Sequence, residues 1–486
     1  MKTLRALLAV LLLLTAVAVA PTPTYAAGPQ GIQFGRPIDD SGNILLTDAV
    51  AASLAASGAG WVRLNFRLGP WTSDTAQFYS TYDTIVNNLR NHGLQVVGLM
   101  SNEFYPGTQS DWTANNYENT GGNGHNAYID SFGYQAARVA NHYQSNVKYW
   151  EVWNEPNCYA TQTGPTTFTG CSYMYPSNFA DLLGHVYTQL KYYNHYDVQV
   201  ISGGLLGHSI GDVYSSGNAG ATYLTNTYSM GINHGSWNWI KANAGSYPLD
   251  GIGQHIYITQ GGTVSSTNLQ NYLTWVRNAY TAYEGTGTAK KTWVTEIGWP
   301  TDSVSESVQA ANIDTTYQVM KSTSYIASCL WFYLRDEASW SQKWGIQHAD
   351  GTGKTGWTNF QNDTSYEGRN SDGSINQNIL NKYNAMGGIG TNGSPYDNGG
   401  TAYVHYWDYG YVQDFNGGSI GRMAIMTSSS GTFRVDQGFW TTYLSGSNHT
   451  YLKFPTSDAY AYNGGTRQDF QGGYLTWDST NGIVVH

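Results

Sequence analysis

Short apolar segments alternate with longer amphipathic segments along most of this 486-residue chain. The short segments are rich in β-branched and aromatic residues and end at glycine, proline, asparagine or aspartate, which is typical of buried strands. The longer segments repeat their apolar residues with a helical period. The strands expected from this pattern are 31–35, 61–66, 95–100, 147–152, 198–204, 251–256, 292–295 and 328–333. The helices expected between them include 48–57, 78–91, 127–143, 178–193, 269–283 and 308–323.

Eight strand–helix units in succession predict the α/β class and, more specifically, a (β/α)8 barrel over residues 28–390, with 374–386 as its last helix. An open doubly wound sheet is the structural alternative. It is disfavoured because no glycine-rich dinucleotide fingerprint follows the first strand.

The composition changes at residues 387–395, which read GGIGTNGSP, and we expect a flexible linker at 391–398. Beyond it, QDFNGG at 413–418 recurs as QDFQGG at 468–473, so residues 399–486 are predicted to form a small repeat domain. Together with LKFPTSD at 452–458, these segments resemble the LGFP repeats of exported proteins that associate with cell walls. Lys453 stands where that motif has glycine. The resemblance implies a cell-wall glycan as partner; the alternative is that the repeats only cap or solubilise the rest of the chain.

The N-terminus has the features of a secretory signal peptide. Lys2 and Arg5 precede an apolar run at 6–20 and a stretch of small residues at 21–27. The apolar run is shorter than the ~20 residues that a bilayer requires. We therefore expect residues 1–27 to be removed and the mature chain to be secreted, without a membrane partner.

Charge and composition limit the classes of molecule that the chain is expected to bind. The formal net charge of −10 argues against nucleic acid or another polyanion. Only 12% of residues are charged whereas 14% are aromatic. Sugars are commonly held by aromatic faces and neutral hydrogen-bonding groups, so a neutral glycan fits, although an exported β-rich protein without a sugar ligand has the same composition.

The three cysteines are Cys158, Cys171 and Cys329. Cys158 and Cys171 flank a loop and are expected to form a disulfide, which contributes roughly 3 kcal/mol on the chain-entropy model. Cys329 lies in an apolar run without a basic neighbour and is expected to be an inert buried thiol. No cysteine or histidine cluster has metal-ligand spacing, so no metal site is expected. No organic cofactor is expected either.

Two predicted strands deliver a glutamate at their carboxyl ends, where barrel enzymes hold their catalytic groups. The first segment, VKYWEVWNEP at 147–156, ends on Glu155, and the second, KTWVTEIGWP at 291–300, carries Glu296. A pair of carboxyl groups of this kind suggests hydrolysis of a glycosidic bond, with Glu155 as acid/base and Glu296 as nucleophile. Retention of configuration requires the two groups to lie roughly 5–5.5 Å apart, and inversion roughly 6.5–9.5 Å.

Other polar residues accompany the pair on the predicted strand ends. Arg63 could hold Glu296 ionised, or could form a purely structural ion pair. His255 and Tyr257 are two residues apart and share a face of their strand, where the tyrosine hydroxyl could support the nucleophile. The alternative for His255 is a satisfied core residue. Asn154 could bond a sugar hydroxyl beside the scissile bond.

Further candidates for substrate binding are less specific. Trp331 could form the floor of a sugar subsite, although core packing alone also accounts for it. Asn102 and Glu103 follow the third strand and could belong to a subsite. The aromatic residues expected on the loops of the cleft are Trp71, Tyr105, Trp112, Trp299, Trp340 and Trp344.

This set of residues resembles the clan A glycoside hydrolases over about residues 28–390. WEVWNEP at 150–156 is similar to the acid/base motif of families 39 and 5, and TEIGWP at 295–300 is similar to the nucleophile motif of several clan members. Family 5 further implies an arginine, a His-x-Tyr pair and a tryptophan, which Arg63, His255, Tyr257 and Trp331 match. The histidine that family 5 has after the third strand is missing, since MSNEF stands at 100–104.

The resemblance implies a retaining β-glycoside hydrolase that acts on a polysaccharide or oligosaccharide. One alternative is a transglycosylase that uses the same covalent intermediate. The other is a non-catalytic glycan-binding or wall-attached barrel.

Overall fold

The computed structural model describes residues 30–68, 72–158, 172–207, 219–363, 368, 370, 374–386, 392–396, 404–417 and 420–486. The predicted signal peptide at 1–27 lies outside the described residues. Among the helices of the described part, none is both long and apolar enough to cross a membrane.

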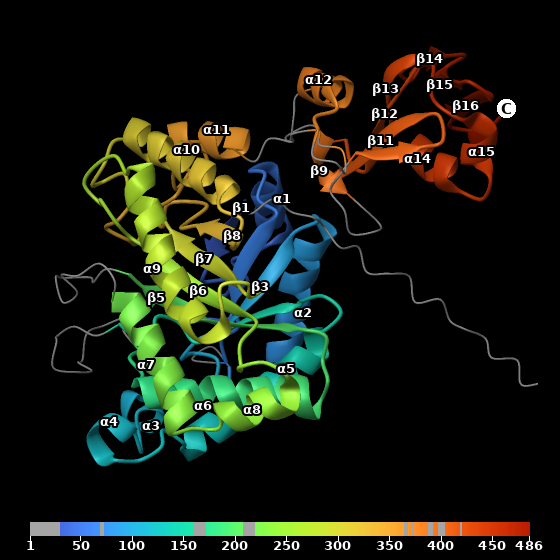
Figure 1. The fold of residues 1–486 in the computed structure, drawn as a ribbon. Helices are drawn as coiled ribbons and strands as arrows, with labels where there is room; N and C mark the ends of the chain where they lie inside the picture. The colour runs from blue at the N-terminus through green and yellow to red at the C-terminus, as the bar shows by residue number, and fades with distance from the viewer. Residues whose placement is uncertain are drawn as a thin grey trace, which may run out of the picture.

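Eight parallel strands form a closed barrel in chain order, and β8 pairs with β1 to complete it (Figure 1). The strands are β1 (Gln30–Phe34), β2 (Trp61–Asn65), β3 (Gln95–Met100), β4 (Tyr149–Val152), β5 (Gln199–Leu206), β6 (Gly251–Ile256), β7 (Lys291–Ile297) and β8 (Ile326–Trp331). Each overlaps the segment expected from the sequence. The prediction of a (β/α)8 barrel is therefore confirmed.

Helices surround this barrel, and several of them begin at a residue whose side chain caps the first turn. Thr47, Asp74, Asn126, Ser265 and Ser305 each accept a hydrogen bond from a backbone N–H of the first helical turn. The helices are α1 (Asp48–Ala56), α2 (Thr75–Asn91), α3 (Gln109–Trp112), α4 (Tyr117–Thr120), α5 (Ala127–Tyr143), α6 (Pro176–Tyr187), the π-helix η1 (Thr188–Tyr193), α7 (Ala219–Asn233), α8 (Trp237–Ala244), α9 (Ser266–Glu284), α10 (Glu306–Ser322) and α11 (Thr355–Asp363). Every helix expected in this region is present, and α3, α4, α7, α8 and α11 are additional.

The interior of the barrel is apolar where the strands begin and polar where they end. Near the start of their strands, Trp61 packs edge-on against Tyr149 and Trp293, with ring centroids 4.9 and 5.3 Å apart. Side chains of a strand return to the same face after two residues. The residues two positions further along these strands are Arg63, Glu151 and Thr295. A layer of charged and polar groups therefore lies directly above an aromatic layer.

The C-terminal region consists of two antiparallel sheets that reproduce the sequence repeat. The first contains β9 (Gly393–Tyr396), β10 (His405–Trp407), β11 (Gly410–Gly417), β12 (Met423–Ser428) and β13 (Gly431–Val435), and the second β14 (Tyr460–Tyr462), β15 (Gly465–Phe470), β16 (Gly473–Asp478) and β17 (Gly482–Val485). The helices α14 (Gln437–Leu444) and α15 (Asn448–Leu452) connect them. Both sheets contribute to one apolar core that includes Val412, Met426 and Leu475. Lys453 has a φ of 58°, a backbone conformation that favours glycine.

The division of the chain differs from the predicted one at two points. Helix α12 (Gln377–Ala385), expected to complete the barrel, instead packs Ile379 and Tyr383 against the first C-terminal sheet, where Tyr383 stacks on Phe415. In addition, β9 pairs with β11, so the middle of the predicted linker is a strand. A short apolar pair four residues apart marks a buried helix face but does not specify its partner. Residues 391, 397 and 398 of the predicted linker lie outside the described residues.

Candidate active site

Charged side chains converge at the carboxyl ends of β2, β4, β6 and β7. Glu296 lies near the end of β7 and points into the barrel, and the adjacent Thr295 does so as well. Two consecutive inward side chains require a break in the alternation of a strand, and the pairing of β7 with β8 shifts register between Val294 and Ile297. The pairing of β6 with β7 shifts in the same way between Gln254 and His255. These irregularities aim the site residues at one another.

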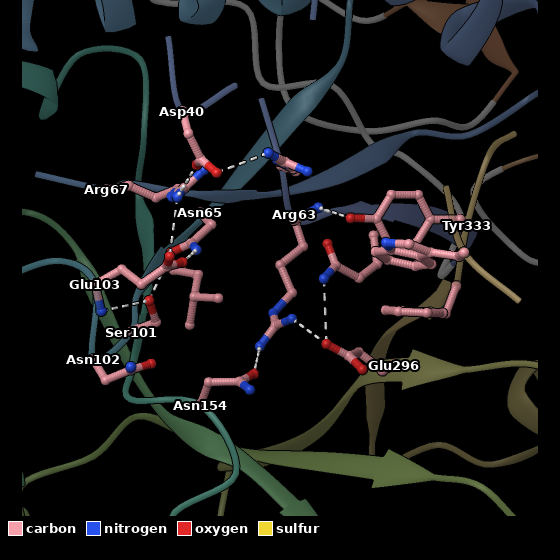
Figure 2. A pocket seen from close by; sticks show the side chains of 16 residues that line it. Asp40, Arg63, Asn65, Arg67, Ser101, Asn102, Glu103, Asn154, Glu296 and Tyr333 are labelled. Atoms are coloured by element: carbon pink, nitrogen blue, oxygen red, sulfur yellow. Dashed lines mark hydrogen bonds and ion pairs between the residues drawn. The ribbon is translucent and has the colours of Figure 1, made fainter. Parts of the chain in front are cut away.

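Arg63 is the hub of the group (Figure 2). Its fully buried guanidinium donates from Nη1 to Glu296 Oε1 at 2.6 Å and from Nη2 to Asn154 Oδ1 at 2.7 Å. Its Nε donates to Glu151 Oε2 at 2.5 Å. Charge-assisted bonds in a buried fork of this kind fix both distance and direction. Arg63 therefore holds the nucleophile candidate and the residue before Glu155 in a defined relation.

Glu151 is the buried counter-charge of Arg63, and the sequence analysis did not identify it. Its Oε1 accepts hydrogen bonds from Gly204 N at 2.8 Å and from Thr295 Oγ1 at 3.0 Å. Gly204 also leaves space for His255, because a Cβ at this position would lie 2.1 Å from His255 Nε2. The two-residue spacing from Tyr149 could have placed Glu151 inside the barrel, but nothing in the pattern named its partner.

Glu155 reaches the site through an unusual turn after β4. Trp153 and Glu155 have φ angles of 75° and 46°, values that residues other than glycine seldom adopt. Backbone of this kind occurs preferentially at functional sites. The Glu155 side chain is 13% exposed and that of Glu296 is 8% exposed. Both carboxylates are thus largely removed from solvent yet open to the mouth of the barrel.

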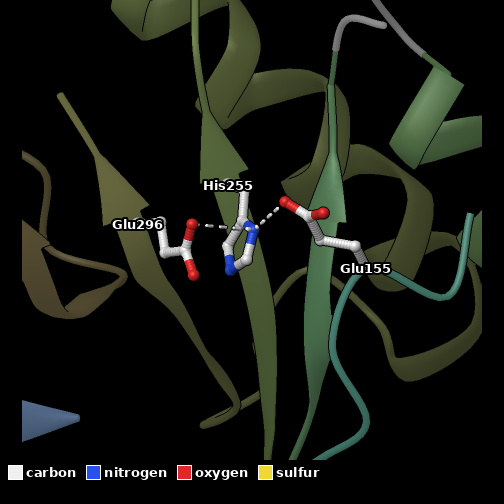
Figure 3. A group of neighbouring side chains, drawn as sticks. All are labelled: Glu155, His255 and Glu296. Carbon is white, nitrogen blue, oxygen red and sulfur yellow. Dashed lines mark hydrogen bonds and ion pairs between the residues drawn. The ribbon is translucent and has the colours of Figure 1, made fainter. Parts of the chain in front are cut away.

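His255 lies between the two glutamates (Figure 3). Its Nδ1 is 2.8 Å from Glu155 Oε1 and 3.6 Å from Glu296 Oε2. One ligand atom from each of these three residues lies within 4.8 Å of the others, so among the described residues they form a group that could hold a metal ion. The 2.8 Å contact has hydrogen-bond length, and Arg63 already places a cation on Glu296. We therefore interpret the trio as a hydrogen-bonded cluster.

The surroundings of Glu296 favour its ionised form. Burial by itself raises the pKa of Glu296, but the charges of His255 and Arg63 and the hydrogen bond from Tyr257 outweigh burial and hold this pKa below its ordinary value. The Tyr257 hydroxyl donates to Glu296 Oε2 at 2.5 Å. For His255, burial lowers the pKa, but the charge of Glu296 and the hydrogen bond with Glu155 raise it above the ordinary value overall. Glu296 is therefore suited to act as an ionised group.

A cavity of about 540 Å³ opens beside Glu296. Its lining residues are Gln33, Gly35, Arg36, Asp40, Arg63, Asn65, Arg67, Leu99, Ser101, Asn102, Glu103, Asn154, Glu296, Phe332, Tyr333 and Trp340. Asn102 and Asn154, both predicted to bind substrate, belong to this lining. Arg63, His255 and Tyr257 contact one or both glutamates directly. Their catalytic and binding roles remain predictions.

Two of the residues predicted to contact substrate are packed in the core of the barrel domain. Trp331 and Trp299 are fully buried, pack on each other with ring centroids 5.8 Å apart, and do not line the cavity. Trp299 Nε1 donates to the backbone oxygen of Ile258 at 2.8 Å. The neighbouring Phe332 lines the cavity instead. Because successive strand residues face opposite ways, a displacement by one residue exchanges a core position for a site position.

Of the other aromatic residues expected on the loops, some line or support the cavity and others pack elsewhere. Trp340 lines the cavity, and Trp344 supports it from behind by packing edge-on against Tyr257 and Phe332. Tyr105 and Trp112 pack against Tyr128 away from the cavity. Trp71 lies outside the described residues.

Two of the three cysteines, Cys158 and Cys329, lie among the described residues. Cys158 is buried, whereas Cys171 lies outside the described residues, so their disulfide stays a prediction. Cys329 is a buried free thiol, and burial raises its pKa above the ordinary value. The thiolate is therefore disfavoured at this position.

Substitution at the two neighbouring aromatic positions should separate packing from binding. We expect Trp331→Ala to lower the free energy of unfolding by about 3–5 kcal/mol, because it opens a cavity in the core. Phe332→Ala should be less destabilising and should raise KM for the substrate, because this ring lines the cavity. Urea unfolding and steady-state kinetics measure both effects. If folded Trp331→Ala raised KM more than Phe332→Ala does, the assignment of Trp331 to the core and of Phe332 to the cavity would be contradicted.

No protein-family model matches the sequence, and no curated protein matches it. Solved structures with a similar fold include a family 39 glycoside hydrolase from Bacteroides cellulosilyticus, with 14% identity, 82% of this chain and 70% of that chain covered, and a TM-score of 0.47. GH5_18 from Streptomyces cattleya, solved with GlcNAc, has 15% identity, covers 69% of this chain and 80% of that chain, and has a TM-score of 0.47. A GH128 endo-β-1,3-glucanase from Amycolatopsis mediterranei, solved with laminarihexaose, has 15% identity, covers 69% and 98%, and has a TM-score of 0.39. Sequence identities of 14–15% leave the function of this chain to the chemistry of its site.

Proposed function

We propose that this protein is a secreted retaining β-glycoside hydrolase that cleaves a polysaccharide or oligosaccharide. The observation that carries the proposal is the pair of glutamates at the mouth of the barrel. One carboxylate oxygen of Glu155 and one of Glu296 lie within 4.8 Å of each other. Retaining enzymes hold their carboxyl groups roughly 5–5.5 Å apart, whereas inverting enzymes leave roughly 6.5–9.5 Å for a water molecule. The short separation supports retention.

The proposed reaction has two displacements. In the first, a Glu296 oxygen forms a bond to the anomeric carbon while Glu155 gives its proton to the departing glycosidic oxygen. In the second, Glu155 takes a proton from water, whose oxygen then bonds to the anomeric carbon and releases Glu296. Arg63 and Tyr257 keep Glu296 ionised and oriented for attack. Asn154, held by Arg63, faces the cavity where the sugar ring would lie.

The configuration of the first product tests this proposal. The protein is incubated with a panel of β-glucans, mannans, xylans and arabinogalactans, and the anomer released from the best substrate is followed by NMR before mutarotation. We expect the β-anomer first. Release of the α-anomer would contradict the retaining mechanism. Absence of cleavage across the panel, together with binding of one of its glycans, would favour a glycan-binding barrel. Transfer products formed at high substrate concentration would indicate transglycosylation.

Export and wall attachment belong to the proposal as well. The signal-peptide features at 1–27 support secretion, and the resemblance of the repeated C-terminal segments to LGFP repeats supports a cell-wall glycan as their partner. Pull-down of the mature chain, residues 28–486, and of its Lys453→Gly variant on purified cell-wall material tests the second part. Failure of both to sediment with the wall would contradict it.

Removal of the Tyr257 hydroxyl should shift the pH dependence of activity. The hydrogen bond from Tyr257 stabilises ionised Glu296, so its loss in Tyr257→Phe raises the pKa of Glu296. The acid limb of kcat/KM should then move to higher pH, by roughly one unit. Tyr228→Phe is the matched control, because it also removes a buried hydroxyl that donates to a glutamate, Glu284, but at a distance from the site. An unmoved acid limb in Tyr257→Phe, or an equal shift in the control, would contradict the role of Tyr257.

A further inference from the structure

The cavity beside Glu296 extends to a group of charged residues that the proposed mechanism does not use. Asp40, Arg67 and Glu103 lie across the cavity from Glu296 and Tyr333, with Arg63 between the two groups (Figure 2). We propose that this charged end is a second sugar subsite on the glycone side of the cleft and that it accepts an uncharged sugar. The inference rests on the proposed function and specifies its substrate.

The assignment to the glycone side follows from the two glutamates. Glu155 has to meet the leaving group, so the leaving part of the substrate lies on the side of Glu155. The cavity is lined by Glu296 and Asn154 but, among the described residues, not by Glu155 or His255. The part of the substrate that stays bound to Glu296 therefore extends into this cavity, toward β1, β2 and β3.

Ion pairs and a hydrogen bond connect the residues of the charged end. Arg67 Nη2 lies 3.1 Å from both Asp40 Oδ1 and Glu103 Oε1, and Arg36 Nη2 lies 3.1 Å from Asp40 Oδ2. Asn65 Nδ2 donates to Glu103 Oε2 at 2.8 Å. The Arg67 side chain is only 6% exposed, whereas Glu103 is 39% and Asp40 59% exposed. A buried cation therefore positions two carboxylates whose oxygens face the cavity.

The charge balance of the lining selects an uncharged ligand. The three lining arginines are each paired with a lining carboxylate, namely Arg36 with Asp40, Arg67 with Asp40 and Glu103, and Arg63 with Glu296. A carboxylate on the sugar would compete with Glu103 for Arg67, and an ammonium group would compete with Arg67 for Glu103. A hydroxyl group can donate to a carboxylate and accept from a guanidinium without separating the pair.

The remainder of the cavity suits the apolar face of a sugar ring. Phe332 and Trp340 line it with their rings nearly parallel, at 16° and 6.1 Å between centroids. The volume of about 540 Å³ falls within the ~300–1,000 Å³ of small-molecule sites and exceeds the space that one pyranose ring fills. One part of the cavity lining is thus aromatic and another is charged, and the cavity has room for two sugar units.

Paired aryl glycosides test the subsite in the full chain. A 4-nitrophenyl β-monoglycoside occupies only the position at Glu296, and the β-disaccharide glycoside of the same sugar also occupies the second position. After the preferred sugar has been found with β-glucosides, β-mannosides, β-xylosides and β-galactosides, kcat/KM is compared for the two. In Glu103→Gln we expect the disaccharide-to-monosaccharide ratio of kcat/KM to fall about 10- to 100-fold. The wild type should cleave the disaccharide glycoside at least tenfold faster than its analogue with a carboxylate at C6 of the terminal sugar.

The control is Glu306→Gln on α10, whose glutamate has a similar exposure of 35% and contacts His348 outside the cavity. Its ratio should equal that of the wild type, and thermal unfolding verifies that both variants fold. An unchanged ratio in Glu103→Gln, or equal cleavage of the carboxylate analogue, overturns the subsite. Loss of monoglycoside hydrolysis in Glu296→Gln together with an unchanged ratio in Glu103→Gln would leave the proposed function standing and remove only this inference. Full activity of Glu296→Gln would remove the proposed function itself.

Discussion

Replacing Glu296 by glutamine should lower kcat/KM on every glycoside substrate by at least about 10⁴-fold, because no other group then forms the covalent bond to the anomeric carbon. Glu296 contacts Gln33, Arg63 and Tyr257 with its two oxygens. Glutamine has nearly the same shape but neither the charge nor the nucleophilicity of the carboxylate. The loss should therefore be chemical rather than structural.

Glu155→Ala provides the contrasting result. It should lose most activity on substrates with a poor leaving group but retain formation of the glycosyl-enzyme from an aryl glycoside with a good one. Added azide should then restore turnover of Glu155→Ala and yield a β-glycosyl azide, whereas Glu296→Ala should give an α-glycosyl azide. Activity measured with and without azide, with the product identified by NMR, checks both. The opposite pattern of products would exchange the two roles, and full activity in both variants would exclude this pair of glutamates.

Arg63→Met should both destabilise the fold and disable the site. Arg63 and Glu151 are both fully buried, so the substitution leaves an uncompensated charge on Glu151. Breaking a buried ion pair in this way costs about 3–5 kcal/mol of the free energy of unfolding. Activity should fall by about 10²- to 10³-fold, the range seen when one preorganised donor of a site is removed, because Glu296 and Asn154 lose their shared donor.

The double variant Arg63→Met/Glu151→Gln separates the two consequences. It removes the uncompensated charge, so most of the stability should return while activity stays low. Arg277→Met is a control for loss of an arginine on the outer helix α9, where the side chain bonds the backbone oxygen of Lys290. Urea unfolding and kinetics of all three variants measure the outcome. A single variant as stable as the wild type, or recovery of activity in the double variant, would contradict the account of Arg63.

Hydrogen bonds around Arg63 offset the free-energy cost of burying its charge beside two carboxylates. Each of its three nitrogens donates to a buried or half-buried oxygen, and Gly204 and Thr295 supply further bonds to Glu151. Such networks stabilise little relative to an apolar core of the same shape, but they permit few alternative arrangements. Their value here is the fixed position and charge of Glu296.

The local pattern of the sequence was sufficient for the barrel and for its two glutamates. Alternation of β-prone apolar segments with helical segments is a property of neighbouring residues, so all eight strands could be located from it. Glu155 and Glu296 follow apolar strands directly, and strand ends in a closed parallel barrel meet at one edge. The same reasoning brought Arg63, Asn154, His255 and Tyr257 to that edge. These features depend on sequence order and strand period alone.

The direction in which side chains face, and the distant residues they contact, were decided only by the tertiary structure. Register shifts on β6 and β7 decide that His255 and Glu296 point inward, and a single-residue displacement gives the cavity Phe332 rather than Trp331. The partner of Glu151 is Arg63, which lies 88 residues earlier in the chain and which no local pattern specifies. The apolar pair on α12 had two possible partners, and packing placed it on the C-terminal sheet. The sequence by itself determined the eight strands of the barrel and where the two acids lie. Long-range contacts decided which side chains face the cavity, because those choices depend on strand register and on residues distant along the chain.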